Sequence, residues 1–298
     1  MRGVVVALGN FDGVHLGHQV VLRRAVEEGE KRGARVVAAT FDPHPRAVLG
    51  AGKSPRLLTP LGLRREALVR YGADEVCVIT FDLALSRKSP REFVRDVLVG
   101  QIAAEAVVVG ENFRFGHRAA GDVGDLAALM EETGGEAYAV AVRGAGEREE
   151  ISSSRIRRLV SEGAVAAAVG LLGRPYVLRG EVVEGDRRGR SIGFPTANVL
   201  PDPLALIPAR GVYAGSVRVG KEMYAACTNV GLAPTFDRAE SRVEAHLLDF
   251  EDDLYGQVVD VAFARRIRDE KRFSGVDELK EQIRRDVEQA RRIAEDLG

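Results

Sequence analysis

The first half of the chain alternates short apolar runs with stretches whose apolar residues recur at helical spacing. Five runs predict strands: Val4–Leu8, Arg35–Phe41, Glu75–Thr80, Ala106–Val109 and Glu136–Val142. Helical patterns separate them, at about Leu16–Lys31, Leu61–Tyr71, Pro90–Val99 and Asp122–Thr133. Strands that are apolar throughout and separated by helices indicate a parallel sheet covered on both faces. Because ligands of such sheets bind beyond the carboxyl ends of the strands, we expect a site in the loops after the first, second and fourth strands.

The second half begins with an alanine-rich helical stretch, Ile151–Leu172, which Gly163 is expected to interrupt. Gly173–Pro175 then forms a linker. Five further runs predict strands, mostly without helical patterns between them: Val177–Val183, Gly211–Val219, Met223–Val230, Arg242–Phe250 and Val258–Arg266. This pattern indicates an antiparallel sheet or small barrel, followed by an amphipathic helix at Val276–Leu297. We therefore predict an α/β domain over residues 1–172 and a β domain with a terminal helix over residues 173–298.

Composition narrows the classes of function. A chain of 298 residues is longer than a single hydrophobic core usually organises, so we expect two domains. A formal net charge of −1 speaks against a general nucleic-acid binder, which carries a basic excess or a basic face. Cys77 and Cys227 each lie in an apolar run and form neither a disulfide framework nor a zinc motif. No apolar run is long enough to span a membrane and no signal peptide precedes the first strand, so we expect a cytoplasmic protein without nucleic-acid or membrane partners. The sequence does not indicate an oligomeric state.

The stretch GNFDGVHLGH, Gly9–His18, joins the first strand to the first helix. Its glycines allow a tight turn and the close approach of a ligand, and the start of a helix offers free N–H groups to an anion. His15 and His18 are three positions apart and so share one face of the helix, where they can stabilise charge on a phosphoryl oxygen. A structural pair or a metal site are the alternatives, although no third ligand lies nearby in the sequence.

The His-x-Gly-His element resembles the signature of nucleotidyltransferases that transfer AMP or CMP. The longer string is similar to that of prokaryotic FAD synthetases, the bifunctional riboflavin kinase/FMN adenylyltransferases. Three more strings of that family follow in order, TFDPHP at Thr40–Pro45, GENFRFG at Gly110–Gly116 and ISSSRIR at Ile151–Arg157. The resemblance implies a Rossmann-like nucleotidyltransferase domain.

The same resemblance implies roles for individual residues of the first half. His15 and His18 would hold the ATP phosphates and stabilise the transition state, and the pocket around them would be shaped by Gly9, Phe11 and Asp12. Asn112 would orient phosphate or the incoming FMN. The triphosphate would be bound by Ser152, Ser153 and Arg157. Without the resemblance, capping of the following helix is the plainer interpretation of the serines.

A second phosphate-binding pattern, GDRRGRSIGFPTAN, runs from Gly185 to Asn198. Its glycines permit a loop that folds over phosphates, and its arginines add positive charge. Thr196 and Asn198 are two positions apart, so on an extended segment they face the same way and can share one hard cation such as Mg²⁺. An exposed turn with incidental arginines is an equally good interpretation of this loop alone.

This second pattern, with TNVGLAPTF at Thr228–Phe236 and VEAHLLDF at Val243–Phe250, resembles the riboflavin kinase signature. The resemblance implies an antiparallel riboflavin-kinase β-barrel with a terminal helix. It implies that Thr196 and Asn198 ligate Mg²⁺ and that Glu244 is the general base, although a solvent-facing strand residue is the alternative for Glu244. Nucleotide and flavin would be bound by Gly185, Arg190, Gly193, Asn229 and Arg268.

The whole pattern favours a bifunctional enzyme. Riboflavin and ATP would give FMN in the second domain, and FMN and ATP would give FAD and pyrophosphate in the first, both with Mg²⁺. An RNA-acting synthetase is a competing hypothesis, but it should carry a lysine-rich KMSKS-like loop where ISSSRIR stands. A flavin-binding sensor without activity is a third hypothesis, and it should have lost residues such as His15 or Glu244, which are present.

Overall fold

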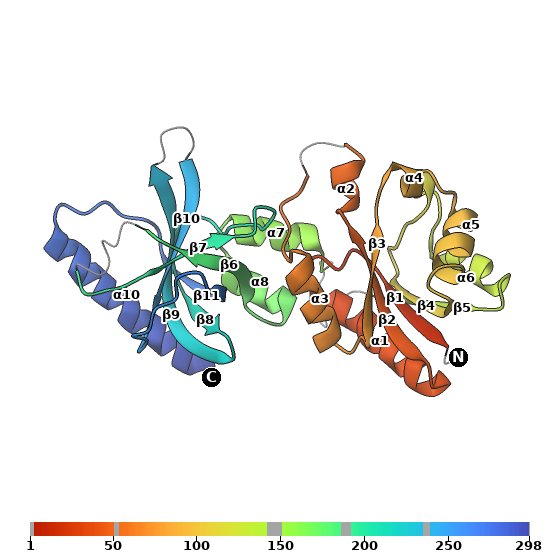
Figure 1. The fold of residues 1–298 in the computed structure, drawn as a ribbon, viewed down its shortest axis with the longest axis horizontal. Helices are drawn as coiled ribbons and strands as arrows, with labels where there is room; N and C mark the ends of the chain where they lie inside the picture. The colour runs from red at the N-terminus through yellow and green to blue at the C-terminus, as the bar shows by residue number, and fades with distance from the viewer. Residues whose placement is uncertain (1–2, 51–53, 142–150, 186–191, 235–238, 298) are drawn as a thin grey trace. The chain divides into compact units, whose positions relative to one another are not determined.

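The chain forms two compact units, Met1–Ser153 and Ser154–Gly298, which are shown in Figure 1. Its structure is a computed structural model that describes residues 3–50, 54–141, 151–185, 192–234 and 239–297. No helix in these ranges is long and apolar enough to cross a membrane.

The first unit is a parallel sheet of five strands in the order β3-β2-β1-β4-β5. The strands are β1 (Val4–Leu8), β2 (Arg35–Asp42), β3 (Glu75–Thr80), β4 (Ala104–Gly110) and β5 (Glu136–Val140). The helical elements are α1 (Leu16–Arg32), α2 (Pro45–Val48), α3 (Leu61–Arg70), α4 (Leu83–Ser86), α5 (Pro90–Glu92), the π-helix η1 (Phe93–Val99), the short 3₁₀ turn η2 (His117–Ala119) and α6 (Val123–Glu131). The strand order reverses direction between β1 and β4, and such a switch point is where ligands of open α/β sheets bind.

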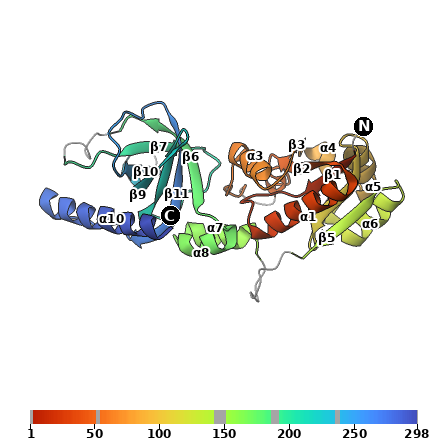
Figure 2. The same ribbon diagram turned by 90° about the horizontal axis from the view of Figure 1, so that it is seen from below.

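Both faces of this sheet are buried, as its continuous apolar strands require. Along β1, Val4, Val6 and Leu8 pack with η1 and α6. The alternate residues Val5 and Ala7 pack on the other face with α1 and α3. The helices thus lie in two layers around the sheet, as Figures 1 and 2 show.

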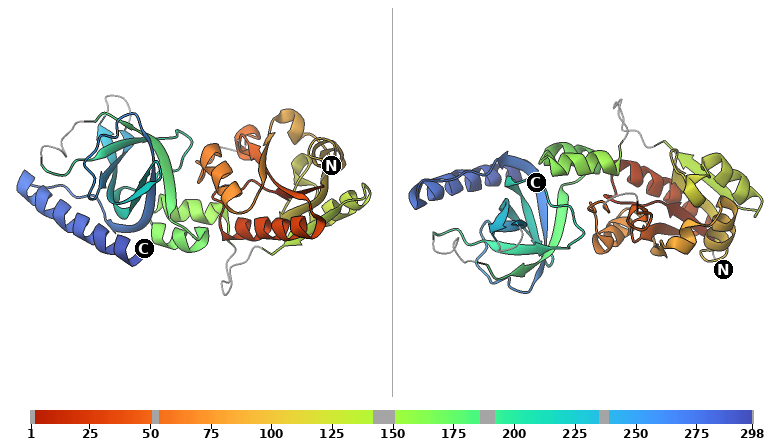
Figure 3. Two further views of the ribbon diagram at one scale, coloured as in Figure 1. Left: turned by 60° about the horizontal axis from the view of Figure 1, so that its bottom comes forward. Right: turned by 90° about the horizontal axis from the view of Figure 1, so that it is seen from above.

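The second unit is a closed antiparallel barrel with the strand order β10-β7-β6-β11-β8-β9. Its strands are β6 (Tyr176–Val183), β7 (Ala197–Pro201), β8 (Gly211–Val219), β9 (Glu222–Pro234), β10 (Ala239–Leu247) and β11 (Val258–Arg268). Its helices are α7 (Ser153–Ser161), which begins at the division between the units, α8 (Val165–Leu172) and α10 (Val276–Leu297). Figure 3 shows α10 running along the outside of the barrel, where Ala290 and Ile293 pack on Val212, Ala214 and Cys227.

The predicted fold class is confirmed in both halves of the chain. Gly163 interrupts the helical stretch as expected, with φ at 78° between α7 and α8. The pattern did not predict the short elements α2, α4 and β7, because four or five residues are too few to show a period. The domain boundary at residue 172 stays a prediction. The compact units divide nineteen residues earlier, since α8 packs on β6 and β11 of the barrel.

Candidate functional site

The loop Gly9–His15 leaves the central strand β1 in an uncommon backbone conformation. Phe11, Gly13 and Val14 have φ values of 49°, 95° and 40°, and a β-branched residue such as Val14 rarely adopts a positive φ. Phe11 and Val14 are fully buried, so core packing stabilises the strained turn. Backbone strain of this kind persists where the surroundings over-determine it, and it is frequent at functional sites.

Asp12 anchors this loop to the segment before α3. Its buried carboxylate accepts hydrogen bonds from the backbone N–H of Thr59 at 2.9 Å and from its hydroxyl at 3.4 Å. The same hydroxyl accepts a hydrogen bond from the N–H of Gly13 at 2.8 Å. Asp12 therefore shapes the turn through Thr59, a residue that no sequence motif had singled out.

The two histidines meet at the start of α1. His15 is the N-cap residue, and its Nδ1 accepts a hydrogen bond from the N–H of His18 at 3.3 Å. Because Nδ1 is the acceptor, the neutral ring carries its proton on Nε2. The two imidazoles stack with their centroids 3.6 Å apart and their planes 16° apart. The ring of Phe11 meets that of His18 edge-on, with the two ring centroids 5.2 Å apart. The predicted pair is thus brought together beside the free N–H groups of the helix.

The charge state of His18 is set by its surroundings. Burial of the ring, the adjacent His15 and the Arg64 guanidinium together hold the pKa of His18 well below 6.5. Its Nδ1 is buried and has no hydrogen-bond partner among the described residues. His18 is therefore neutral at neutral pH before any ligand binds, and an arriving anion would favour its protonation.

The other residues predicted for this site lie on other segments of the chain. Gly9 follows β1, and its N–H donates to Ala39 of β2 at 3.1 Å. Ser153 donates its hydroxyl to the carbonyl of Asp12 at 2.8 Å, which links the start of α7 to the histidine loop. Asn112 is exposed and follows β4, the strand beside β1. Ser152 directly precedes α7, and Arg157 lies one turn along that helix, in the second unit.

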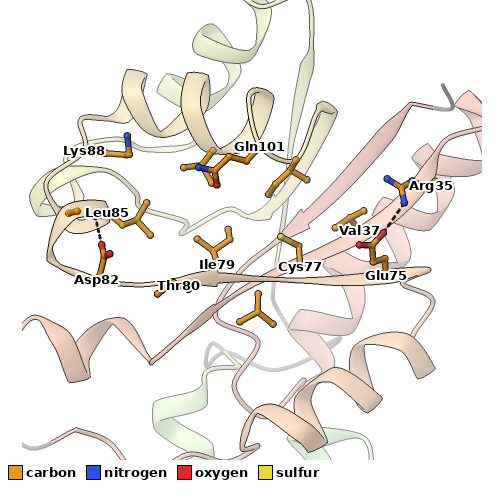
Figure 4. Close-up of a pocket in the computed structure, with 14 residues that line it drawn as sticks. Arg35, Val37, Glu75, Cys77, Ile79, Thr80, Asp82, Leu85, Lys88 and Gln101 are labelled. Atoms are coloured by element: carbon orange, nitrogen blue, oxygen red, sulfur yellow. Dashed lines mark hydrogen bonds and ion pairs between the residues drawn. The ribbon is translucent and has the colours of Figure 1, made fainter.

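A cavity of about 500 Å³ also opens in the first unit, beside the edge strand β3. Figure 4 shows Cys77 and Ile79 directed into it, with the Arg35–Glu75 ion pair of 2.8 Å at one end. Among the described residues, none of those predicted for nucleotide binding lines this cavity. It is separate from the loops that follow β1, β2 and β4.

In the second unit, a row of side chains crosses five strands of the barrel. Glu244 on β10 lies opposite Asn198 on β7 and Asn229 on β9. Asn229 lies opposite Val212 on β8, which in turn lies opposite Arg268 on β11. Residues directly opposite one another in a sheet point to the same face. All five line one cavity of about 290 Å³.

A further wall of this cavity, which we name the α10 cavity, comes from α10. Leu279, Ile283 and Val287 of that helix give it an apolar side. Asp286 of the same helix is buried and pairs with Arg268 at 2.7 Å. A pocket that combines an apolar side with convergent polar groups is typical of a site for a small organic molecule.

A second cavity of about 350 Å³, which we name the outer cavity, shares a wall with the first. Thr196 and Asn198 line both cavities. The outer cavity is also lined by residues of β6, β7 and β10 and by the segment that follows β10, including Phe250 and Tyr255. The predicted cation-binding pair thus lies between two spaces of the size of small ligands.

The contacts of this shared wall are tight. Asn198 Oδ1 accepts a hydrogen bond from Arg242 Nε at 2.9 Å, and the same Nε lies 3.3 Å from Glu244. A Cβ atom at Gly185 would come within 2.2 Å of Asn198 Nδ2, so only glycine allows this approach. Gly193 has φ at 89°, another conformation that favours glycine.

Arg190, like Arg187 and Arg188, lies outside the described residues. Within the described part of the chain, no group of three or more His, Cys, Asp or Glu side chains gathers in an arrangement that could hold a metal ion. Any Mg²⁺ at the shared wall would therefore depend on the neutral oxygens of Thr196 and Asn198 and on ligand oxygens. Mg²⁺ commonly binds in this way, with few protein ligands and with substrate phosphates.

Sequence reasoning missed Arg64, Arg242 and Asp286. Arg64 could have been noticed, since it occupies the buried helical face that Leu68 continues one turn later. Arg242 precedes Glu244 by two residues and so shares its face. Asp286 carried no such signal, because only the fold shows which face of α10 is covered.

Comparison with known proteins identifies one family in each half of the chain. A family model described as FAD synthetase matches residues 1–155, and one described as riboflavin kinase matches residues 172–294. A crystal structure described as a macrolide-efflux protein from Streptococcus pneumoniae has a TM-score of 0.89 at 34% identity, covering 97% of this chain and 94% of that chain. That name differs from those of the two family models, which agree with the curated relatives.

Two of those relatives are bifunctional riboflavin kinase/FMN adenylyltransferases. The one from Bacillus subtilis (strain 168) is 38% identical over 298 residues, which are 98% of this chain and 93% of the relative. The one from Escherichia coli (strain K12) is 38% identical over 295 residues, which are 97% and 92% of the two chains. With both family models matched and these relatives aligned over nearly their whole length, the chain belongs to the family of bifunctional riboflavin kinase/FMN adenylyltransferases.

Proposed function

We propose that the second unit phosphorylates riboflavin with ATP to give FMN, and that the first unit transfers AMP from ATP to FMN to give FAD and pyrophosphate. The observation that carries the proposal is the wall of Thr196 and Asn198 between two cavities, with Glu244 on one side of it. A kinase needs this arrangement, because phosphoryl transfer requires an acceptor and a donor in line.

In the kinase reaction, riboflavin occupies the α10 cavity with its ring against the apolar side chains of α10. Glu244 accepts the proton of the 5′-hydroxyl group, and the hydroxyl oxygen attacks the γ-phosphorus of ATP. ADP leaves, and FMN remains in the cavity. Glu244 is suited to this role because Arg242 holds its carboxylate in place at 3.3 Å and a positioned base accelerates such a transfer.

ATP occupies the outer cavity with its terminal phosphates at the shared wall. Thr196 and Asn198 supply the hard oxygen ligands that Mg²⁺ prefers, and we assign them to it. When bound, Mg²⁺ would neutralise charge on the phosphate oxygens. Gly185 and Gly193, with Arg190 from outside the described residues, bind the phosphates from the loop between β6 and β7, and Asn229 and Arg268 bind the flavin.

In the adenylyl transfer, a phosphate oxygen of FMN attacks the α-phosphorus of ATP, and pyrophosphate leaves. The nucleophile is ionised at neutral pH, so positioning and charge neutralisation are sufficient. The Nε2–H of His15 donates to a phosphate oxygen, and His18 beside it takes up positive charge as the anion arrives. The N–H groups at the start of α1 add to the same site.

Around this centre, Gly9, Phe11 and Asp12 give the loop its conformation. We assign Asn112, Ser152, Ser153 and Arg157 to contacts with phosphate. Mg²⁺ would supply further charge neutralisation here when bound with the substrate phosphates.

Incubation of the protein with riboflavin, ATP and Mg²⁺, followed by chromatography of the flavins, tests the proposal. We expect FMN first and FAD afterwards, and the appearance of neither product would overturn it. His15→Ala should accumulate FMN without FAD, because the kinase cavity is intact. If His15→Ala makes FAD at the wild-type rate, the adenylyl site has been assigned to the wrong residues.

A further inference from the structure

Arg64 is an arginine in a place that usually holds an apolar side chain. It lies on α3 and is 0% exposed, the largest fully buried side chain among the described residues. Burial of a guanidinium is costly unless its donors find acceptors. Its partners should therefore show why the fold retains it.

Those partners come from three segments at the carboxyl edge of the sheet. Nη1 donates to the carbonyl of Asn10 at 3.3 Å, to the hydroxyl of Thr40 at 3.1 Å and to the carbonyl of Phe41 at 2.9 Å. Nε contacts the carbonyl of Thr59 at 3.4 Å. Arg64 thus joins the segment after β1, the end of β2 and the segment before α3.

The charge of Arg64 is only partly compensated. All its acceptors are neutral, and no described carboxylate lies within the 4.0 Å of an ion pair. Nη2 is buried and has no hydrogen-bond partner in the part of the chain that the structure describes. Asp12 and Asp42 are near enough to favour the charge, but burial still lowers the pKa of Arg64 below its usual value.

This charge is attached to the loop that carries the histidine pair. Nη1 of Arg64 binds the carbonyl of Asn10 at 3.3 Å, and the same loop leads to His15, the N-cap residue of α1. His15 and Arg64 both lower the pKa of His18. Fixed charges that need no rearrangement are the most effective means of stabilising a phosphoryl transition state.

We propose that Arg64 is a positioning residue for adenylyl transfer. It anchors the Gly9–His15 loop through Asn10, and it supplies a buried positive charge that attracts the phosphates of ATP. This inference rests on the proposed adenylyl transfer in the first unit. Arg64 acts through the loop and His18 and does not touch the reacting atoms. The bound phosphates would compensate the charge that the protein itself leaves unpaired.

Arg64→Met, which keeps the length of the side chain without its charge, tests the inference. We expect the rate of FAD formation from FMN and ATP to fall on the order of 100-fold, as misplacement of a reacting group commonly does. Riboflavin phosphorylation should be unchanged, because that reaction takes place in the other unit. In the ligand-free protein, the pKa of His18 measured by NMR should rise. Arg64→Lys keeps the charge and should remain within about tenfold of the wild-type rate.

Leu68→Ala is the matched control. It removes packing from the same buried face of α3, one turn further on, and changes no charge. A purely structural role of Arg64 would make Arg64→Met and Leu68→Ala alike in FAD formation and in the pKa of His18, and this would overturn the inference. If Arg64→Met does not fold, Arg64→Gln keeps an N–H donor for the carbonyls and carries the same expectations.

The outcome for the wild-type protein separates the two hypotheses. If it makes no FAD from FMN and ATP, the proposed function of the first unit fails. If it makes FAD and Arg64→Met makes it equally fast, only the inference about Arg64 fails.

Discussion

Glu244 is the side chain that we propose as the general base of the kinase reaction. Its conversion to glutamine keeps the shape and removes the proton acceptor, so we expect the kcat of riboflavin phosphorylation to fall by about 10²–10⁴-fold. The KM for riboflavin should change little, because the cavity is preserved. FAD formation from added FMN should be unaffected. Glu222→Gln, an exposed residue at the start of β9, is the control. A Glu244→Gln protein with the wild-type kcat would contradict the assignment.

His18 makes the stability of the first unit sensitive to acid. Its pKa is held well below 6.5 in the folded chain by burial, His15 and Arg64, whereas the unfolded chain titrates near the usual value. Below about pH 6.5 the unfolded chain therefore binds more protons, and the free energy of unfolding falls as the pH falls. Calorimetry between about pH 7 and pH 5 should show a smaller loss of stability in His18→Gln than in the wild type. Equal losses in the two proteins would contradict the neutral state of His18.

Spacing along the chain predicted some of these residues and could not predict others. His15 and His18 at three positions, and Thr196 and Asn198 at two, share a face in any helix or strand respectively. The row that joins Glu244 to Asn229 and Arg268 depends on the register of neighbouring strands, and register is a property of the folded sheet. Arg64 is recognisable only after the three segments that supply its acceptors have come together.

Among the elements, β7 illustrates the same limit. It is five residues long and carries Asn198, yet the pattern did not predict it. Its strand conformation follows from pairing with β6 on one side and β10 on the other. Local propensity is a weak guide for so short a strand, because neighbours supply most of the stabilisation.

Gly185, in the connection between β6 and β7, lies close to Asn198 of β7, and this contact leads to a prediction for β7. A Cβ atom at Gly185 would meet the Asn198 amide at 2.2 Å, so Gly185→Ala must displace Asn198 from the shared wall. We expect the kinase rate to fall by about tenfold or more and FAD formation from FMN to be preserved. Gly170→Ala in α8, where no atom lies within 4 Å of the added Cβ, is the control. Equal kinase rates in both variants would show that Asn198 need not hold its position.

For the molecule as a whole, the hydrophobic patterns of the two halves of the sequence predicted the two architectures. Continuous apolar strands between helices indicated the parallel sheet, and closely spaced strands indicated the barrel, since each pattern can bury its apolar face in few ways. The loops after the first, second and fourth strands proved to be neighbours because the strand order places β1 between β2 and β4. The helical stretch Ile151–Leu172 was predicted to belong to the first domain, but its pattern alone does not show which core its apolar face covers.

The packing of α7 and α8 leads to a prediction about that boundary. Ile156, Val160, Val165 and Leu171 are buried, the carbonyl of Val160 accepts a hydrogen bond from Ala209 at 3.2 Å, and α8 packs on β6 and β11. Each fully buried side chain of this kind contributes about 1.5–3 kcal/mol. A fragment of residues 152–298 should therefore melt at least about 5 °C above one of residues 173–298, as measured by circular dichroism. Both fragments contain the whole α10 cavity, so kinase activity at low temperature is the control for folding. If the two melt together, the second domain begins at residue 173, and α7 and α8 only connect the units.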